Sequence, residues 1–276
     1  MATMQVLSDL HLETPKSYDL FDITPKADYL ALLGDIGNIV PHREECLAFL
    51  RRQLQHFRVI LLVPGNHEAF GSSWSEAMAV LRQFEEEISQ QRRESHGAGL
   101  GEFVLLDRGL FELPTDDGKK ITVLGCSLFS HVPPQRAMNV EMGLNDFYHT
   151  TDWDICKHNE AHSRDLTWLN EQVSRIQGQD SAKIIVFTHW SPSTDTRSTD
   201  PKHANSAINS AFSTDLSDQL CFTSDKVVLW VFGHTHYNCD FEVERKEAKP
   251  LRLVTNQRGY YFAQAAGFDV EKIIEI

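Results

Sequence analysis

The chain reads YLALLGDIGN over residues 29–38, an uninterrupted apolar run that stops at a glycine and an aspartate. A short Val-, Ile- or Leu-rich run without alternating polar residues is typical of a strand buried on both faces. Residues 59–68 repeat the arrangement as VILLVPGNHE. Because ligands bind beyond the carboxyl ends of strands in open α/β sheets, both runs predict polar side chains gathered at one edge of a sheet.

Three more apolar runs end in residues that ligate metals: residues 4–8, 184–188 and 227–233. Residues two apart in an extended chain point to the same side, so the pairs Asp9/His11 and His234/His236 are each expected to aim two ligands at one site. Seven candidate ligands follow from the five runs: Asp9, His11, Asp35, Asn66, His189, His234 and His236. They exceed one tetrahedral zinc site and suit two ions that share a carboxylate.

The donor atoms are oxygens and imidazole nitrogens without thiolate. Imidazole suits zinc, iron or nickel, and carboxylate suits manganese or magnesium. Two divalent metal ions are therefore the expected cofactors. Manganese is the first expectation, with iron, zinc, nickel or magnesium as alternatives.

Short apolar runs alternate with helical patterns along the whole chain, which predicts one α/β domain over residues 1–276. The predicted strands cover residues 4–7, 29–33, 59–63, 103–106, 121–129, 183–187, 227–232, 241–244, 251–254 and 272–275. Apolar positions three or four apart predict helices over residues 74–93 and 159–176, and a shorter helix over 44–55. Residues 191–213 are polar and lack periodicity, and a loop of that length predicts a substrate-facing lid.

The composition excludes several classes of protein. The formal net charge is −13, with 39 acidic and 26 basic residues, so long nucleic acid is not an expected partner. Five cysteines without a CxxC pair indicate reduced thiols rather than a disulfide framework. No apolar run reaches the length of a membrane span, and the expected location is the cytoplasm.

Taken in order, the clusters resemble the motifs of the calcineurin-like metallophosphoesterases. They stand as DxH at residues 9–11, GDxxN at 34–38, GNHE at 65–68, a single His189, and GHTH at 233–236. The segments TNQRGY (255–260), GCSLFS (125–130) and LNDF (144–147) resemble microbial members of the family. The resemblance implies an α/β four-layer sandwich of two mixed β-sheets flanked by helices, with the metal site at the carboxyl ends of the strands.

The resemblance also implies roles for the residues. One ion would take Asp9, His11 and His236, the other Asn66, His189 and His234, and Asp35 would bridge them. The implied reaction is phosphoester hydrolysis by metal-activated hydroxide, with His67 as general acid.

Asn38 is expected to assist His67, although many family members have an aspartate there that orients the acid histidine. Asn38 can still hydrogen-bond but brings no charge. Ser/Thr protein phosphatases continue this motif with Asp-Arg-Gly, whereas this chain continues with Asn38-Ile39-Val40, so protein phosphatase activity is not expected.

The expected substrate is a small phosphorylated molecule, such as a nucleotide, and either a monoester or a diester fits the motifs. Asn66, His131 and His203 are the candidate substrate contacts, and Asn145 and Asp146 are further candidates. Two other functions stay open. One is a non-catalytic metal-binding scaffold of the same fold, and the other is a dinuclear hydrolase of an amide or lactone.

Overall fold

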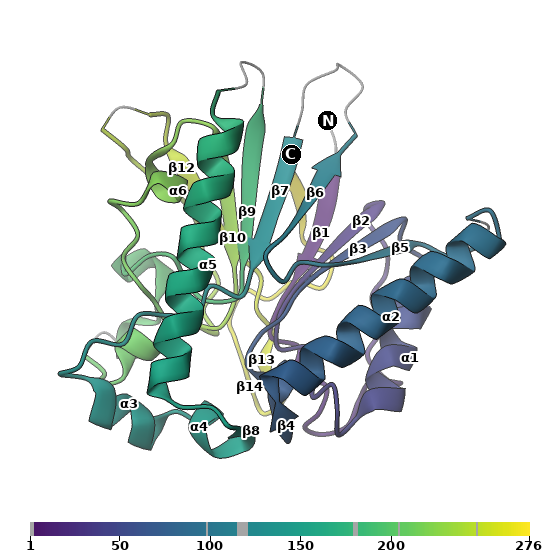
Figure 1. Cartoon of the computed structure of the whole chain (residues 1–276), viewed down its shortest axis with the longest axis horizontal. Coiled ribbons are helices and arrows are strands. Elements are labelled where there is room, and N and C mark those ends of the chain that lie inside the picture. Colours follow the sequence, from purple (N-terminus) through teal and green to yellow (C-terminus); the bar gives the residue numbers. More distant parts are fainter. Residues whose placement is uncertain (1–2, 98, 115–120, 179–181, 204, 247) are drawn as a thin grey trace.

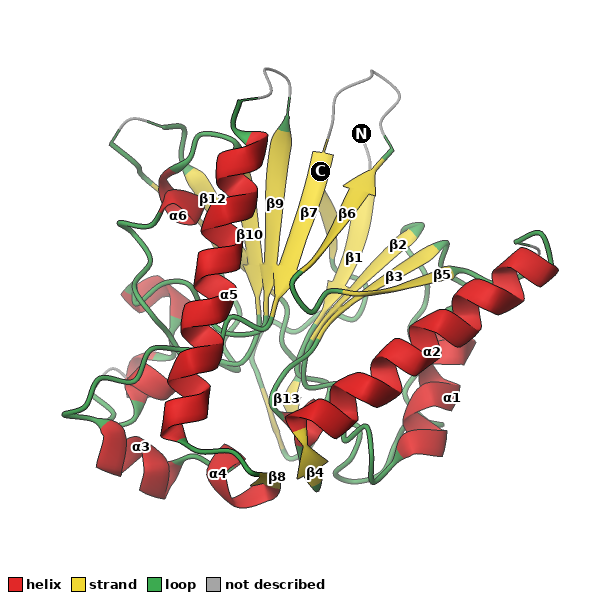
Figure 2. Cartoon of the chain, viewed as in Figure 1, coloured by secondary structure: helices red, strands yellow, loops and turns green. Residues whose placement is uncertain are grey.

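The computed structural model describes residues 3–97, 99–114, 121–178, 182–203, 205–246 and 248–276. Two mixed β-sheets lie face to face at its centre (Figures 1 and 2). The first has the order β15-β1-β2-β3-β5. It consists of β1 (Thr3–Leu7), β2 (Tyr29–Leu33), β3 (Val59–Val63), β5 (Glu102–Leu105) and β15 (Ile273–Glu275). All its neighbours pair in parallel except β15 with β1.

The second sheet has the order β11-β12-β10-β9-β7-β6. Its four central strands are parallel, and both edge strands pair antiparallel with their neighbours. Its strands are β6 (Gly109–Leu113), β7 (Ile121–Cys126), β9 (Lys183–Thr188), β10 (Val227–Phe232), β11 (Asp240–Val243) and β12 (Leu251–Thr255). The central strands therefore direct their carboxyl ends to the same edge of the sheet.

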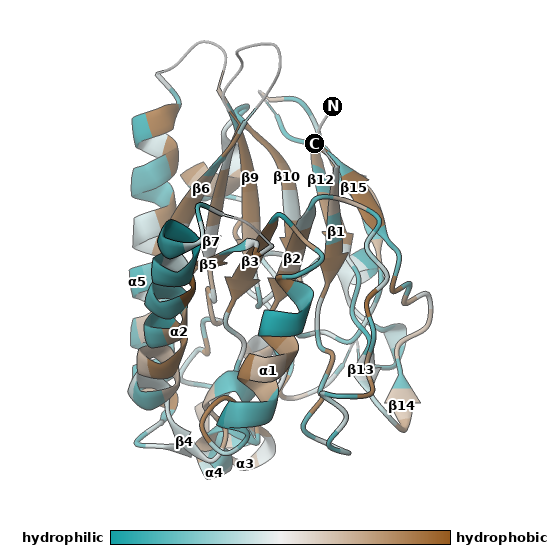
Figure 3. Cartoon of the chain, turned by 90° about the vertical axis from the view of Figure 1, so that its right-hand side faces the viewer, coloured by the Kyte–Doolittle hydropathy of each residue, from teal (hydrophilic) through white to brown (hydrophobic). Residues whose placement is uncertain are grey.

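Alternate residues of the apolar strands enter two different cores. In β2, Ala31 and Leu33 pack between the two sheets, whereas Leu30 and Leu32 pack against the helices. Successive side chains of a strand point to opposite faces, which is why a strand between two cores carries no polar position. Figure 3 shows these apolar strands inside helices whose outer faces are hydrophilic.

Helices cover the outer face of each sheet (Figure 2). The first sheet is covered by α1 (Arg43–Gln53) and α2 (Trp74–Glu94), and the second by α5 (Ile155–Ile176) and α6 (Leu220–Thr223). Sheets and helices together form the expected four-layer α/β arrangement, so the predicted fold class is confirmed. Two further short helices, α3 (Ala137–Gly143) and α4 (Asp146–His149), lie before α5 in the chain. Among the described helices, none has the length and apolarity needed to cross a membrane.

Helix ends follow capping chemistry that the periodicity did not reveal. Ser73 begins α2 with a capping box, because its side chain accepts from the Glu76 amide while the Glu76 carboxylate accepts from Ser73. The predicted start of α5 at residue 159 was four residues late. Asp154 caps this helix by accepting a hydrogen bond from the Lys157 amide at 2.8 Å.

Three other expectations need correction. The predicted strand over residues 121–129 ends at Cys126, because Leu128 and Phe129 adopt left-handed backbone with φ of 76° and 50°. Strand β6 and the two-residue strands β4 (Ser72–Ser73), β8 (Thr150–Thr151), β13 (Gly259–Tyr260) and β14 (Ala263–Gln264) were not predicted. The segment 191–213 contains three short 3₁₀ turns, at Thr196–Ser198, Pro201–His203 and Asn209–Ala211.

Candidate metal centre

The predicted ligands meet where the two sheets end at their carboxyl edges. Ligand atoms of Asp9, His11, Asp35 and His236 lie within 4.8 Å of one another, and so do those of Asp35, His189 and His234. Asn66 joins the second group, because its Oδ1 lies 3.1 Å from Nε2 of His189. We call these seven residues the ligand cluster. Asp35 belongs to both groups, as expected for two neighbouring cations that share a carboxylate.

The pairs Asp9/His11 and His234/His236 were expected to lie on extended backbone, and this expectation was wrong. The paired ligands do not stand on extended backbone. Left-handed φ angles of 47° to 68° occur at five members of the cluster: Asp9, His11, Asp35, His234 and His236. Such angles are uncommon for residues other than glycine, and they gather at functional sites where surrounding structure holds them. The pairs therefore reach one site through successive tight turns.

Two glycines let the loops that carry the cluster approach each other closely. Gly34 has a φ of +86°, and a Cβ atom there would overlap the His189 ring. A Cβ atom on Gly65 would overlap the Asp35 carboxylate. A side chain at either position would therefore push a ligand out of place.

The ionisation of Asp35 and His234 suits cation binding. Burial alone would raise the pKa of Asp35, but the neighbouring His189 and His67 rings outweigh it and hold that pKa well below its usual range. Burial lowers the pKa of His234 well below its usual range, which keeps the ring neutral. Its Nε2 is buried without a hydrogen-bond partner in the described structure. Carboxylate oxygens and such an unpartnered imidazole nitrogen fit a divalent metal ion.

A backbone carbonyl group orients the ring of His189. Its Nδ1 lies 2.7 Å from the carbonyl oxygen of Leu33, to which an Nδ1–H can donate. Its Nε2 then faces Asp35, 3.4 Å from Oδ1. Metal-binding histidines commonly use the second nitrogen in this way, which fixes the tautomer.

Glu68 ties together the two loops that follow β2 and β3. Its fully buried carboxylate accepts hydrogen bonds from the backbone amides of Asp35 at 2.9 Å, Ile36 at 2.8 Å and Gly65 at 2.6 Å. Three amides from these two loops thus share one carboxylate. The carboxylate supplies acceptors to amides that lie beyond the last paired residues of β2 and β3.

Replacing Glu68 by alanine is expected to lower the free energy of unfolding by about 3–5 kcal/mol, because buried amides would lose their acceptor. Urea denaturation of the variant measures this loss. Glu86→Ala, on the exposed face of α2, is the control and should change stability by less than about 0.5 kcal/mol. A Glu68→Ala loss below about 1 kcal/mol would show that solvent or another group takes over the three amides.

His67 lies beside the ligand cluster. Its Nδ1 is 2.7 Å from Oε1 of Glu13, and its Nε2 is 3.9 Å from Oδ2 of Asp35 and 3.5 Å from the hydroxyl of Tyr260. The ring stacks on Phe70 with centroids 4.1 Å apart. Burial alone would lower the pKa of His67, but Asp35 and Glu13 outweigh it and raise the pKa to about 9. A protonated ring at this position is suited to donate a proton.

The other predicted site residues have varied positions. The side-chain amide of Asn38 donates to the backbone carbonyl of His67 at 2.8 Å, so Asn38 supports the loop rather than the ring. His203 lines a cavity beside the cluster. His131 is exposed, donates its backbone N–H to Thr214 and is absent from the described lining of that cavity.

Three further residues contact members of the ligand cluster. Asp146 accepts from Nδ2 of Asn66 at 2.8 Å, which turns Oδ1 of Asn66 toward the cluster. The Tyr260 ring lies 4.3 Å from the His11 ring. Glu13 contacts both His11 and His67. Of the three, Asp146 was named as a further candidate from the sequence, whereas Glu13 and Tyr260 were not singled out.

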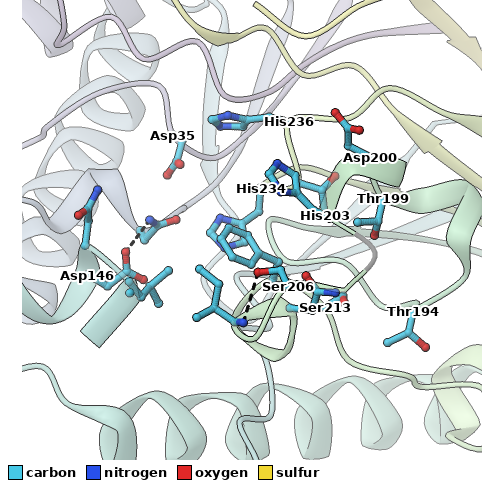
Figure 4. Close-up of a pocket in the computed structure, with 18 of the residues that line it drawn as sticks. Asp35, Asp146, Thr194, Thr199, Asp200, His203, Ser206, Ser213, His234 and His236 are labelled. Atoms are coloured by element: carbon cyan, nitrogen blue, oxygen red, sulfur yellow. Dashed lines mark hydrogen bonds between the residues drawn. The ribbon is translucent and has the colours of Figure 1, made fainter. Parts of the chain in front are cut away.

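The cavity beside the cluster has a volume of about 510 Å³ (Figure 4). Much of its wall comes from the segment 191–213, which was predicted to be a substrate-facing lid. The apolar part of the wall includes Leu144, Ile208, Phe212 and Tyr260. Hydroxyl groups come from Thr194, Thr196, Thr199, Ser206 and Ser213. The described lining contains the carboxylates Asp35, Asp146 and Asp200 but neither lysine nor arginine.

The chain is similar to known proteins in both sequence and structure. The chain is 28% identical over 279 residues to the uncharacterized protein L509 of Acanthamoeba polyphaga mimivirus, covering 94% of this chain and 92% of that protein. It is similar in structure to the phosphopantetheinyl hydrolase PptH of Mycobacterium tuberculosis. That similarity has a TM-score of 0.65 and 13% identity, over 94% of this chain and 90% of that one. A dimetal phosphatase of Danio rerio has a TM-score of 0.47 and 14% identity, over 92% and 86% of the two chains.

The sequence model described as calcineurin-like phosphoesterase matches residues 5–238. The matched range contains every member of the ligand cluster and His67. Since it covers most of the chain, the protein belongs to the calcineurin-like phosphoesterase family.

Proposed function

We propose that this protein hydrolyses a small phosphoester with two divalent ions held by the ligand cluster. The observation that carries the proposal is the position of Asp35 in both ligand groups. One ion is assigned to Asp9, His11 and His236, and the other to Asn66, His189 and His234. When bound, the two ions would supply Lewis acidity toward phosphoryl oxygens and lower the pKa of the attacking water.

The chain's own residues perform the remaining tasks. Asp146 holds the Asn66 amide so that its oxygen faces His189 and the second group. His67 presents Nε2 beside Asp35, where it donates a proton to the departing oxygen. The left-handed turns and the Glu68 carboxylate hold the donors in place before substrate binds, so little rearrangement accompanies the reaction.

The cavity supports a substrate with one phosphoryl group and an uncharged organic part. Its volume of about 510 Å³ matches sites for small molecules. A second phosphate would lie among hydroxyls and near Asp200 without a cationic partner from the described lining. Lys202 is the lysine nearest in sequence to Asp200. It pairs with Asp200 at 2.8 Å and does not line the cavity. A monoester or diester of a nucleoside or another small metabolite satisfies these conditions.

The proposal is tested by assaying chelated protein before and after reconstitution with Mn²⁺, using p-nitrophenyl phosphate and bis-p-nitrophenyl phosphate. Turnover that returns with metal is expected, and the ratio of the two rates ranks monoester against diester. In the same assay at matched free Mn²⁺, AMP should compete about tenfold more strongly than ATP because of charge repulsion. Two bound ions without turnover of either ester would favour a metal-binding scaffold or a hydrolase of another bond.

A further inference from the structure

One carboxylate oxygen contacts two histidines of the site. Oε1 of Glu13 lies 2.7 Å from Nδ1 of His67 and 3.2 Å from Nδ1 of His11. The Glu13 side chain is only 6% exposed, and that of His11 is fully buried. Oε2 of Glu13 is buried without a hydrogen-bond partner in the described structure, so Oε1 carries both interactions.

These contacts determine which nitrogen each ring presents to the site. A carboxylate only accepts, so both rings must carry hydrogen on Nδ1. For His11, this leaves Nε2 as a lone-pair donor, and that atom lies 2.9 Å from Nε2 of His236 and 3.8 Å from Oδ2 of Asp35. For His67, it turns Nε2 toward Asp35 and the Tyr260 hydroxyl.

No other described side chain performs this task for the two rings. Asn38 contacts only the backbone carbonyl of His67. Phe70 stacks on the face of the His67 ring, which limits tilting but does not choose between its nitrogens. The choice of which nitrogen each ring turns toward the site therefore rests on Oε1 of Glu13.

We propose that Glu13 is the positioning residue of the centre: its single acceptor oxygen sets the tautomer of His11, a metal ligand, and holds the Nδ1–H and the orientation of His67, the proton donor. The catalytic half of this assignment rests on the proposed function, whereas the tautomer and ligand half does not. A residue two positions beyond a ligand thus links metal binding to proton donation.

Substitutions at Glu13 separate the effect of side-chain length from the effect of charge. Glu13→Gln keeps an acceptor oxygen at the same reach without the charge. Glu13→Asp keeps the charge but withdraws it by one methylene. Glu13→Leu removes the acceptor at similar volume. If Glu13 acts as a positioned acceptor, the glutamine variant should resemble the parent, and the aspartate and leucine variants should both be impaired. Glu86→Gln, on the exposed face of α2, is the matched control.

The first readout requires no turnover. Nitrogen-15 NMR of histidine-labelled, Zn²⁺-loaded protein reports the ring tautomers. Both rings should show an Nδ1–H in the parent and in Glu13→Gln, whereas Glu13→Asp and Glu13→Leu should lose it for His67. Calorimetric titration with Mn²⁺ should show affinity about 10–100-fold weaker in Glu13→Leu, the usual effect of losing a residue that orients a ligand.

The second readout is turnover of an alkyl phosphoester, which should fall by about 10–100-fold in Glu13→Leu and by much less in Glu13→Gln. Unchanged tautomers and metal affinity in Glu13→Leu would overturn the assignment, and so would an aspartate variant that outperforms glutamine. If Glu13→Leu does not fold, the order of glutamine and aspartate decides alone. Should the parent lack turnover, the NMR and titration results still judge Glu13, and only the proposed function fails.

Discussion

Replacing Asp35 by asparagine is expected to lower kcat/KM for a phosphoester by at least about 10³-fold in saturating Mn²⁺. Asp35 belongs to both ligand groups, so the change removes a charged oxygen from each. It also weakens the turn that carries His67, because Oδ1 of Asp35 accepts the backbone N–H of His67 at 2.9 Å. Steady-state kinetics together with elemental analysis of bound metal measure both effects.

Asp19→Asn is the control for this prediction, because Asp19 is exposed and lies outside the site. Its kinetics and metal content should match those of the parent. A variant at Asp35 that retains two ions and activity within tenfold would remove Asp35 from the bridging position. A variant that keeps one ion and loses activity would instead support the shared carboxylate.

The second large effect is expected at His67. His67→Ala should lower kcat by about 10²–10⁴-fold on an alkyl phosphoester, because the departing alkoxide then receives no proton. The loss should be much smaller on a p-nitrophenyl ester, whose leaving group departs without protonation. Rates measured over a series of leaving groups give the difference directly.

His56→Ala, at an exposed position, controls for general effects of removing a histidine and should leave the series unchanged. Equal losses on alkyl and nitrophenyl esters would exclude proton donation by His67. Such a result would assign the ring a role in binding or in holding the GNHE turn. Metal content measured beside the kinetics separates this outcome from loss of the neighbouring ligand Asn66.

The strands that carry the site could be predicted because a strand buried on both faces has an uninterrupted apolar sequence. Residues 29–33 and 59–63 were predicted to the residue, and both strands are completely buried. Strand β6 was missed because it is an edge strand whose burial is only partial, so its sequence lacks an uninterrupted apolar run. The start of α5 was missed because a capping aspartate, not an apolar position, sets it.

Within the site, the order of the motifs predicted the side chains that meet but not the way they meet. Asp9 and His11 converge through left-handed backbone, which a pattern of residue types does not reveal. Asn38 was expected beside the His67 ring and contacts its backbone carbonyl instead. The carboxylate at the ring is Glu13, which comes from a different motif.

The sequence alone determined the buried central strands, the edge at which the site forms and the candidate ligands that gather there. Each candidate ligand lies within four residues of the end of a buried strand, and parallel neighbours carry those residues to one edge. Tertiary structure alone decided the surroundings: Asp146 behind Asn66, Tyr260 over His11, and the cavity wall from 191–213. These groups come from a short helix, a loop segment and a short hairpin far from their partners in sequence, and only packing of the whole chain sets the distances between them.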